Sequence, residues 1–170
     1  MRDVILPWAV GEVDLGDDVL EVGPGYGATT DVLQEKVGHL TSVEIDTALV
    51  TMLTDRFAHA QNVEIVHGDA TDLAYPDARF SGAACFTMLH HVPTVEMQDR
   101  VFAEVARVLR PGAAFVASDS LASEELASHH DDDTYNPVDP ESLPARLRAA
   151  GFADVEVRTN PFGWAAVARI

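Results

Sequence analysis

Short apolar runs alternate with amphipathic stretches along the chain, which is the pattern of a β-sheet whose strands are connected by helices. The predicted strands cover residues 18–22, 40–45, 63–66, 80–86, 113–118, 155–158 and 162–168. The link Thr159-Asn-Pro-Phe-Gly163 between the last two is short, whereas parallel neighbours need a crossover of about a dozen residues. We therefore expect an α/β fold with a mostly parallel sheet that ends in an antiparallel hairpin.

The stretches between these runs carry apolar residues at helical spacing. Asp46 and Thr94 are suitable N-caps, and Arg110-Pro-Gly112 is expected to close the helix that Thr94 begins. Pro144 fits only the first turn of a helix, so a last helix should start just before it. The predicted helices cover residues 28–37, 46–58, 94–109 and 142–151.

The charge balance is strongly acidic, with 28 acidic against 11 basic side chains and a formal net charge of −17. Phosphate backbones and anionic lipid headgroups are bound by clustered lysines and arginines, and Lys36 is the only lysine. We therefore expect neither a nucleic-acid partner nor a membrane partner. The acidity has two interpretations that stay open, a solvated face or adaptation to a salt-rich host.

The length of 170 residues is typical of one domain, so a single domain over residues 1–170 is expected. No apolar run approaches the ~20 residues of a membrane span, and the start lacks the basic leader of a signal peptide, which favours a cytoplasmic protein. The single cysteine, Cys85, excludes an intrachain disulfide and cysteine-based metal sites. His129-His-Asp-Asp-Asp133 contains metal-ligand residue types, but neighbours along an irregular segment rarely converge on one ion, so no metal site is expected.

A glycine-rich loop and three carboxylates mark the ends of the first three predicted strands. Gly23-Pro-Gly-Tyr-Gly27 follows the first strand, where glycine allows a tight turn and a close approach to a ligand. Glu21 ends the first strand, Glu44 ends the second and Asp69 follows the third. Since the carboxyl ends of parallel strands share one edge, a cofactor with an ammonium, a ribose and an adenine would satisfy all three acids.

Together with two later segments, these residues resemble the motifs of class I S-adenosylmethionine-dependent methyltransferases. The branch they resemble most acts on small molecules and includes ubiquinone and menaquinone biosynthesis methyltransferases. The matching segments are Val19-Leu-Glu-Val-Gly-Pro-Gly-Tyr-Gly27, Val43-Glu-Ile-Asp46, His67-Gly-Asp-Ala70, Phe86-Thr-Met-Leu-His-His91 and Leu109-Arg-Pro-Gly112. The resemblance implies a Rossmann-like sheet of order 3-2-1-4-5-7-6 with the last strand antiparallel and helices on both faces. It also implies a methyltransferase that uses S-adenosyl-L-methionine and releases S-adenosyl-L-homocysteine.

The resemblance assigns a role to each matching residue. The methionine part of the cofactor would be contacted by Glu21 at its ammonium, by the backbone of Gly23, Gly25 and Gly27, and by Tyr26, Phe86 and Leu89. The adenosine part would be contacted by Glu44 at the ribose diol, Ile45 against the adenine, Asp69 at the adenine N6 and the Ala70 amide near the ring.

The sulfonium methyl is already activated, so in-line displacement needs mainly positioning and exclusion of water. His91 is the first candidate for a base or acceptor-orienting group, His90 the second, and Asp119 a weaker one. The alternative is that one histidine caps a turn and the other is solvated.

The acceptor is expected to be a neutral, apolar or cationic small molecule. No Asn/Asp-Pro-Pro-Tyr sequence follows the fourth strand, and the acidity disfavours RNA. The reacting atom, a protein acceptor and a homodimer are left open. Two other functions also fit the glycine loop: a non-catalytic S-adenosylmethionine-binding protein, and an NAD-binding oxidoreductase, which would have no use for Glu21 or Asp69.

Overall fold

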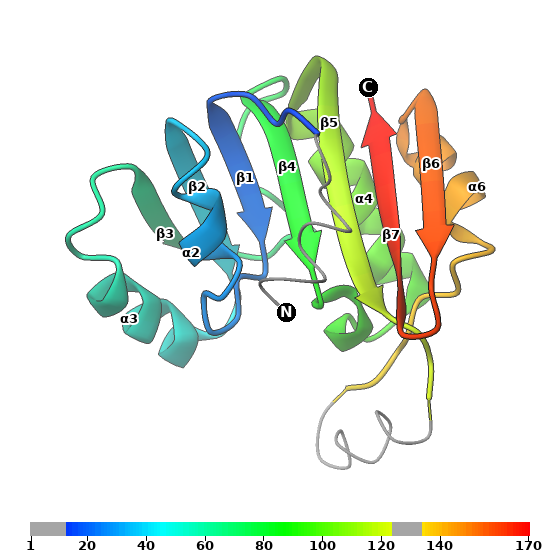
Figure 1. Ribbon diagram of the computed structural model, residues 1–170, viewed down its shortest axis with the longest axis horizontal. Helices are drawn as coiled ribbons and strands as arrows, with labels where there is room; N and C mark the ends of the chain where they lie inside the picture. Colours follow the sequence, from blue (N-terminus) through cyan, green and yellow to red (C-terminus); the bar gives the residue numbers. More distant parts are fainter. Residues whose placement is uncertain (1–12, 124–133) are drawn as a thin grey trace.

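The computed structural model describes residues 13–123 and 134–170, and its strands form one seven-stranded sheet (Figure 1). Their order is β3-β2-β1-β4-β5-β7-β6, and β7 runs antiparallel to both of its neighbours. This confirms the order that the resemblance implied, including the terminal hairpin. The strands are β1 (Asp18–Val22), β2 (His39–Glu44), β3 (Val63–His67), β4 (Phe80–Phe86), β5 (Leu109–Ser120), β6 (Asp154–Thr159) and β7 (Gly163–Arg169).

Helices cover both faces of this sheet (Figure 1). Phe102 of α4 and Leu147 of α6 are buried in one core cluster with Leu20, whereas Leu33 of α2 is buried in a second cluster with Val19. Val19 and Leu20, which are neighbours in β1, thus point to opposite faces of the sheet, as the period of two in a strand requires. The helices are α2 (Thr30–Leu33), α3 (Thr47–Arg56), α4 (Val95–Val108) and α6 (Leu143–Ala150), and none in the described residues is long and apolar enough to cross a membrane.

Local capping signals in the sequence act as expected. The Asp46 carboxylate accepts the backbone N–H groups of Ala48 (2.7 Å) and Leu49 (3.0 Å) at the start of α3. The Thr94 hydroxyl caps α4 in the same way. Gly151 ends α6 in the left-handed region, at φ +115°, where an L side chain would be strained.

The first predicted helix is wrong in length, because α-helical geometry covers only Thr30–Leu33 and not residues 28–37. Its N-cap residue, Thr29, makes no side-chain capping bond, and the Thr30 hydroxyl donates instead to the buried Glu21 carboxylate at 2.7 Å. Three β-branched residues, Thr29, Thr30 and Val32, lower the helix propensity of this segment further. The segment therefore forms a single turn of α-helix, which is followed by hydrogen-bonded turns over residues 34–36.

The expected closure of α4 by Arg110-Pro-Gly112 is also wrong. Leu109 already pairs with Phe80, so β5 begins directly after α4, and the register then shifts before Ala114 pairs with Gly82. Gly112, at φ +81°, lies in this irregular stretch and is not the C-cap of the helix. A proline and a left-handed glycine are both suited to such a bulge, since the proline has no N–H to offer the sheet.

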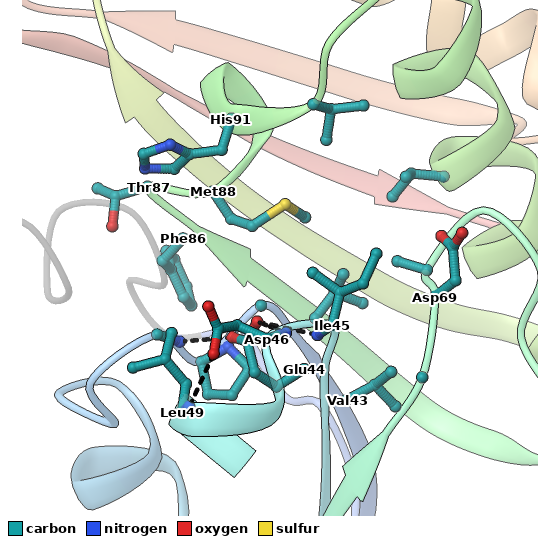
Figure 2. A pocket seen from close by; sticks show the side chains of 18 of the residues that line it. Val43, Glu44, Ile45, Asp46, Leu49, Asp69, Phe86, Thr87, Met88 and His91 are labelled. Atoms are coloured by element: carbon teal, nitrogen blue, oxygen red, sulfur yellow. Dashed lines mark hydrogen bonds between the residues drawn. The ribbon is translucent and has the colours of Figure 1, made fainter. Parts of the chain in front are cut away.

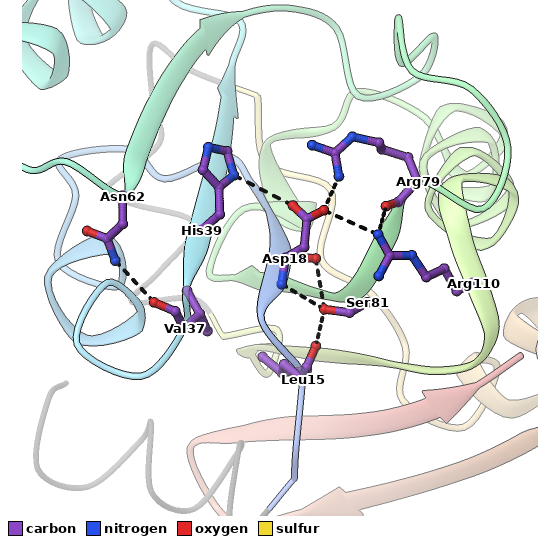
Figure 3. A network of polar contacts seen from close by, with 8 residues as sticks. All are labelled: Leu15, Asp18, Val37, His39, Asn62, Arg79, Ser81 and Arg110. Atoms are coloured by element: carbon purple, nitrogen blue, oxygen red, sulfur yellow. Dashed lines mark hydrogen bonds and ion pairs between the residues drawn. The ribbon is translucent and has the colours of Figure 1, made fainter.

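Polar contacts around Asp18 hold the strands at the amino end of the sheet (Figure 3). The Asp18 carboxylate accepts from the guanidinium groups of Arg79 and Arg110, the latter at 3.3 Å, and His39 Nδ1 lies 3.6 Å from it. These residues come from β1, β2, β5 and the residue before β4, so one carboxylate connects four neighbouring strands.

The central strand β4 contains the only cysteine of the chain. Cys85 is fully buried between β1 and β5. Burial raises the pKa of its thiol well above the usual value, and the carboxylates of Asp119 and Glu21 raise it further. The thiol is therefore a packing group and not a nucleophile.

Candidate functional site

A cavity of about 620 Å³ opens at the carboxyl ends of β1, β2 and β4 (Figure 2). This volume is in the range of cofactor sites, roughly 300–1,000 Å³. Most of the predicted site residues line it, namely Gly23, Gly25, Tyr26, Glu44, Ile45, Asp69, Ala70, Phe86 and His91. The others lie outside its lining, namely Glu21, Gly27, Leu89 and His90.

The three glycines of the loop have left-handed φ angles but different surroundings. Their φ angles are +64° at Gly23, +54° at Gly25 and +78° at Gly27. A Cβ atom on Gly23 would lie 2.2 Å from Met88 Cγ, and one on Gly27 would lie 2.8 Å from Leu53 Cδ2. A Cβ atom on Gly25 would meet nothing within 4 Å. Gly23 and Gly27 therefore permit close packing of the loop, whereas Gly25 keeps open space at the cavity wall.

Glu44 is fixed in the cavity by backbone donors. Its Oε1 accepts the N–H groups of Ile45 (2.9 Å) and Asp46 (3.0 Å), and its Oε2 accepts the N–H of Gly25 (3.2 Å). A carboxylate oxygen has two lone pairs, so Oε2 retains one for a hydroxyl of a ligand. The side chain thus connects the glycine loop to β2 and presents an oriented hydrogen-bond acceptor.

Glu21 is buried outside the cavity lining, at 1% exposure. Its Oε2 accepts the hydroxyl groups of Thr30 (2.7 Å) and Ser42 (2.6 Å), while Oε1 has no hydrogen-bond partner within the described residues. Burial raises the pKa of this carboxyl to about 7, with smaller contributions from the negative charges of Asp31 and Glu44. Its predicted contact with the methionine ammonium stays a prediction.

Asp69 lines the cavity from the turn that follows β3. Its Oδ1 accepts both the backbone N–H and the hydroxyl of Thr71, each at 2.8 Å. This Asx turn fixes the orientation of the side chain, so the other oxygen, Oδ2, is the one available to a ligand.

Two large apolar side chains stand exposed beside the cavity. Tyr26 is 78% exposed and Ile45 is 64% exposed, whereas Phe86 at the end of β4 is buried against the cavity. Arg56 of α3 donates to the Tyr26 carbonyl and so fixes the loop to that helix. Large exposed apolar groups at the edge of a concave site are typical of ligand-binding surfaces.

The two candidate histidines have different surroundings, although their rings lie in contact, with centroids 4.1 Å apart. His91 is exposed and lines the cavity, with its ring near Thr87 and Met88 (Figure 2). The His90 ring lies with its Nδ1 2.7 Å from Asp119 Oδ1, and its backbone N–H donates to Asp119 Oδ2 at 3.1 Å. Asp119 is only 4% exposed, so this pair is largely closed to solvent. The sequence analysis named Asp119 as a separate, weaker candidate for a base or acceptor-orienting group. It did not pair Asp119 with His90, because the two residues are 29 positions apart.

One apolar wall of the cavity was missed by the sequence analysis, and it consists of Met88, Val92, Pro93, Met97 and Val101. Met97 and Val101 are one helical turn apart on α4, a spacing that also fits an ordinary core stripe. Their place at the cavity depends on the packing of the start of α4 beside β4, which no local signal shows.

Metal ligands do not gather in the described part of the chain, where no group of three or more His, Cys, Asp or Glu side chains converges. The segment His129–Asp133, which contains such residue types, lies outside the described residues.

The chain matches the family model of the methyltransferase domain over residues 20–117, more than half of its length. A protein of Pyrococcus furiosus assigned as ribosomal RNA small subunit methyltransferase A is 38% identical over 78 residues, which are 45% of this chain and 28% of that protein. Ribosomal RNA small subunit methyltransferase A of Geobacter metallireducens is 46% identical over 61 residues, 36% of this chain and 22% of that one. The chain thus spans about a quarter of the length of these curated relatives.

Solved structures share the fold over nearly the whole chain, at identities that show the fold alone. A protein of Bacillus halodurans assigned as a methyltransferase has a TM-score of 0.77 at 16% identity, with 99% of this chain and 97% of that one covered. The methyltransferase CalH, in complex with S-adenosylhomocysteine, has a TM-score of 0.73 at 18% identity, covering 91% of this chain and 51% of that one. The [4+2]-cyclase SpnF has a TM-score of 0.73 at 22% identity, covering 92% and 75%. From the family match, the strand order and the glycine loop, the chain belongs to the methyltransferase domain family, among the class I S-adenosylmethionine-dependent methyltransferases.

Proposed function

We propose that the chain transfers the methyl group of S-adenosylmethionine to a small-molecule acceptor by in-line displacement. The observation that carries this proposal is the cavity wall where Gly25 leaves open space and Glu44 presents an oriented carboxylate. A side chain at position 25 would occupy the place of a ligand, and Glu44 Oε2 can accept from a ribose hydroxyl. These two residues fit an adenosine-containing cofactor.

The other residues of the cavity divide between the two parts of that cofactor. Ile45, Asp69 and the Ala70 amide are proposed to hold the adenine, as the resemblance implies. The glycine loop, with Tyr26 and Phe86, is proposed to hold the methionine part. When bound, the cofactor supplies an activated methyl group, and the chain's task is to orient the acceptor in line and to exclude water.

Asp69→Asn is expected to weaken S-adenosylhomocysteine binding by about tenfold, or ~1.4 kcal/mol, which is near the upper end of what one hydrogen bond contributes. The substitution keeps one oxygen for the Thr71 turn but places an amide nitrogen where the adenine amino group needs an acceptor. Calorimetric titration measures the change. Asp72→Asn, at an exposed carboxylate two residues after Ala70 and outside the cavity lining, should bind as the unmodified chain does. Equal affinities for the two variants would contradict the adenine contact.

The charges of the cavity support a small-molecule acceptor over RNA. Glu44, Asp46 and Asp69 line it, and no lysine or arginine does so within residues 13–123 and 134–170. A protein that binds RNA neutralises phosphates with basic side chains, and this chain has a formal net charge of −17. The relatives are nevertheless named for ribosomal RNA, so RNA is the competing acceptor that an experiment has to include.

His91 is proposed to orient the acceptor or to take its proton, and His90, held by Asp119, to fix the turn that carries His91. With an acceptor that must lose a proton, His91→Gln should lower kcat by about a hundredfold and flatten the pH dependence of kcat. The affinity for S-adenosylhomocysteine should stay the same. His59→Gln, at an exposed position outside the cavity lining, is the matched control. An unchanged pH profile in the His91 variant would remove the base role.

The function is tested with methyl-labelled S-adenosylmethionine and two acceptor pools, a small-molecule cell extract and purified ribosomal RNA, each at low and high salt. We expect label in the small-molecule pool. Label in the RNA would overturn the acceptor class. S-adenosylhomocysteine binding without transfer to either pool would favour the non-catalytic alternative, and binding of NAD alone would favour the oxidoreductase.

A further inference from the structure

A short turn of 3₁₀ helix, η1 (Leu89–His91), brings His91 to the cofactor cavity. Val92 and Pro93, which follow the turn, line the same cavity. Because the His91 side chain is exposed, the position of its ring depends largely on the backbone that carries it. A turn of three residues has few hydrogen bonds of its own and leaves carbonyl groups for other partners. The groups that hold η1 therefore decide where His91 lies.

Asn136, which precedes α6, binds this segment at two carbonyl groups. Its backbone N–H donates to the His90 carbonyl at 2.7 Å. Its side-chain Nδ2 donates to the Val92 carbonyl at 3.0 Å. His90 and Val92 are the two neighbours of His91 in the sequence. A single asparagine thus fixes the backbone immediately before and immediately after the histidine.

Gln98 of α4 supplies a second amide at the same turn, and it is buried at 1% exposure. Its Nε2 donates to the Leu89 carbonyl at 3.0 Å and to the Asn136 carbonyl at 2.8 Å. Its Oε1 accepts from Arg146 of α6 at 2.9 Å. An arginine side chain can only donate, so this contact identifies Oε1 as the acceptor and Nε2 as the donor of the amide. Gln98 therefore connects the turn to both α4 and α6.

The opposite side of the turn is held by Asp119 of β5. Its Oδ2 accepts the backbone N–H of His90 at 3.1 Å, and its Oδ1 lies 2.7 Å from His90 Nδ1. The His90 ring lies against the His91 ring, with their centroids 4.1 Å apart. Amides thus hold the carbonyl groups of the segment while a carboxylate holds an N–H, and His91 contacts a ring that is itself fixed.

The placement of His91 matters for a group that orients an acceptor or takes its proton. A shift of about 1 Å at such a group can lower the rate by about a hundredfold. Functional side chains keep their position when further hydrogen bonds lock the elements that carry them. Gln98 and Asn136 lie outside the cavity lining, so they act on a ligand through the turn and not by direct contact.

We infer that Gln98 and Asn136 are positioning residues for methyl transfer, which hold His91 at the cavity by fixing the carbonyl groups on both sides of it. This inference rests on the proposed function and adds to it the two side chains that set the geometry of His91. Arg146 contributes by fixing the orientation of the Gln98 amide.

Two isosteric variants of the full chain, Gln98→Glu and Asn136→Asp, test this assignment. Each replaces an amide donor by a carboxylate oxygen, which repels the carbonyl groups that the amide held. In NMR spectra of the protein saturated with S-adenosylhomocysteine, the nuclear Overhauser contact between the His90 and His91 rings should be strongly weakened in both variants.

The rate of transfer is measured with methyl-labelled S-adenosylmethionine and the small-molecule extract. At saturating S-adenosylmethionine this rate should fall by at least about tenfold in both variants. The KM for S-adenosylmethionine should change by less than about threefold, since an effect on the chemical step alone leaves cofactor binding in place. Asn136→Asp keeps the backbone hydrogen bond to His90, so it decides the question if Gln98→Glu does not fold.

Asn62→Asp is the matched control. Asn62 Nδ2 also donates to two main-chain carbonyl groups, those of Gln34 (2.9 Å) and Val37 (3.1 Å), but at the amino end of the sheet (Figure 3). It lies outside the cavity lining, so neither the contact between the histidine rings nor the rate should change. Thermal unfolding establishes that each variant is folded.

The outcomes separate the inference from the proposed function. A folded Asn136 variant with an unchanged ring contact or an unchanged rate would overturn the inference, and so would an equal loss of rate in the Asn62 variant. Absence of methyl transfer by the unmodified chain would instead overturn the proposed function. The ring contact would then still decide whether the two amides hold His91.

Discussion

Gly25→Val is expected to abolish binding of S-adenosylhomocysteine while the protein stays folded. The backbone at Gly25 has a φ of +54°, and a Cβ atom there would stand in open space at the cavity wall. The two methyl groups of valine would fill that space and move the Gly25 N–H away from Glu44 Oε2. We expect affinity to fall by more than about a hundredfold, or ~2.7 kcal/mol, in a calorimetric titration.

The matched control is Gly112→Val, because Gly112 also has a left-handed φ, +81°, and also has nothing within 4 Å of an added Cβ. It lies in the bulge of β5 and outside the cavity lining, so the same strain acts there without touching the ligand. Both variants should lose stability by similar amounts, which thermal unfolding measures. Normal binding by the Gly25 variant would show that the glycine loop is not the cofactor site.

Glu21→Gln is expected to stabilise the fold above pH 7 and to remove a pH dependence between about pH 4.5 and 7. The pKa of Glu21 is about 7 in the folded protein, against its usual value of 4.5, because burial disfavours the charged form. The folded state therefore binds the proton more tightly than the unfolded state does. The stability is full below pH 4.5 and is lost as the pH rises through 7, by about 3 kcal/mol at most.

Urea unfolding at pH 5, 6, 7 and 8 measures this dependence. At pH 8 the variant should be more stable than the unmodified chain by about 2–3 kcal/mol, and at pH 5 the two should nearly agree. Glu64→Gln, at an exposed carboxylate on β3, is the control and should leave the curve unchanged. Parallel pH curves for the unmodified chain and the Glu21 variant would contradict a protonated Glu21.

The strands and caps could be predicted because their signals are local. The apolar run that ends before Gly23, the N-caps Asp46 and Thr94, and the short link into β7 each depend on a few neighbouring residues. Two elements were wrong because distant contacts decide them. The Thr30 hydroxyl of α2 donates to the Glu21 carboxylate of β1. Leu109 pairs with Phe80 of β4, so the strand begins where the sequence predicted the capped end of the helix.

The positions of acids near strand ends selected Glu21, Glu44 and Asp69 from the sequence, and of these Glu44 and Asp69 line the cavity. Glu44 and Asp69 line the cavity because the carboxyl ends of parallel strands meet at one edge, which the order of runs already implies. The pairing of His90 with Asp119 and the apolar wall from α4 depend on which elements are neighbours in the folded sheet. Those properties arise only when β4 and β5 lie side by side.

The lone thiol in β4 provides a built-in reporter of how often the centre of the sheet opens. Cys85 is fully buried between two hydrogen-bonded neighbours, so a thiol-labelling reagent reaches it only after β4 separates from one of them. Because the chain has no second cysteine, the labelling rate measures this single event without mutation. A ligand that binds only the folded state slows the labelling in proportion to its occupancy, so the same reaction measures cofactor affinity from inside the sheet.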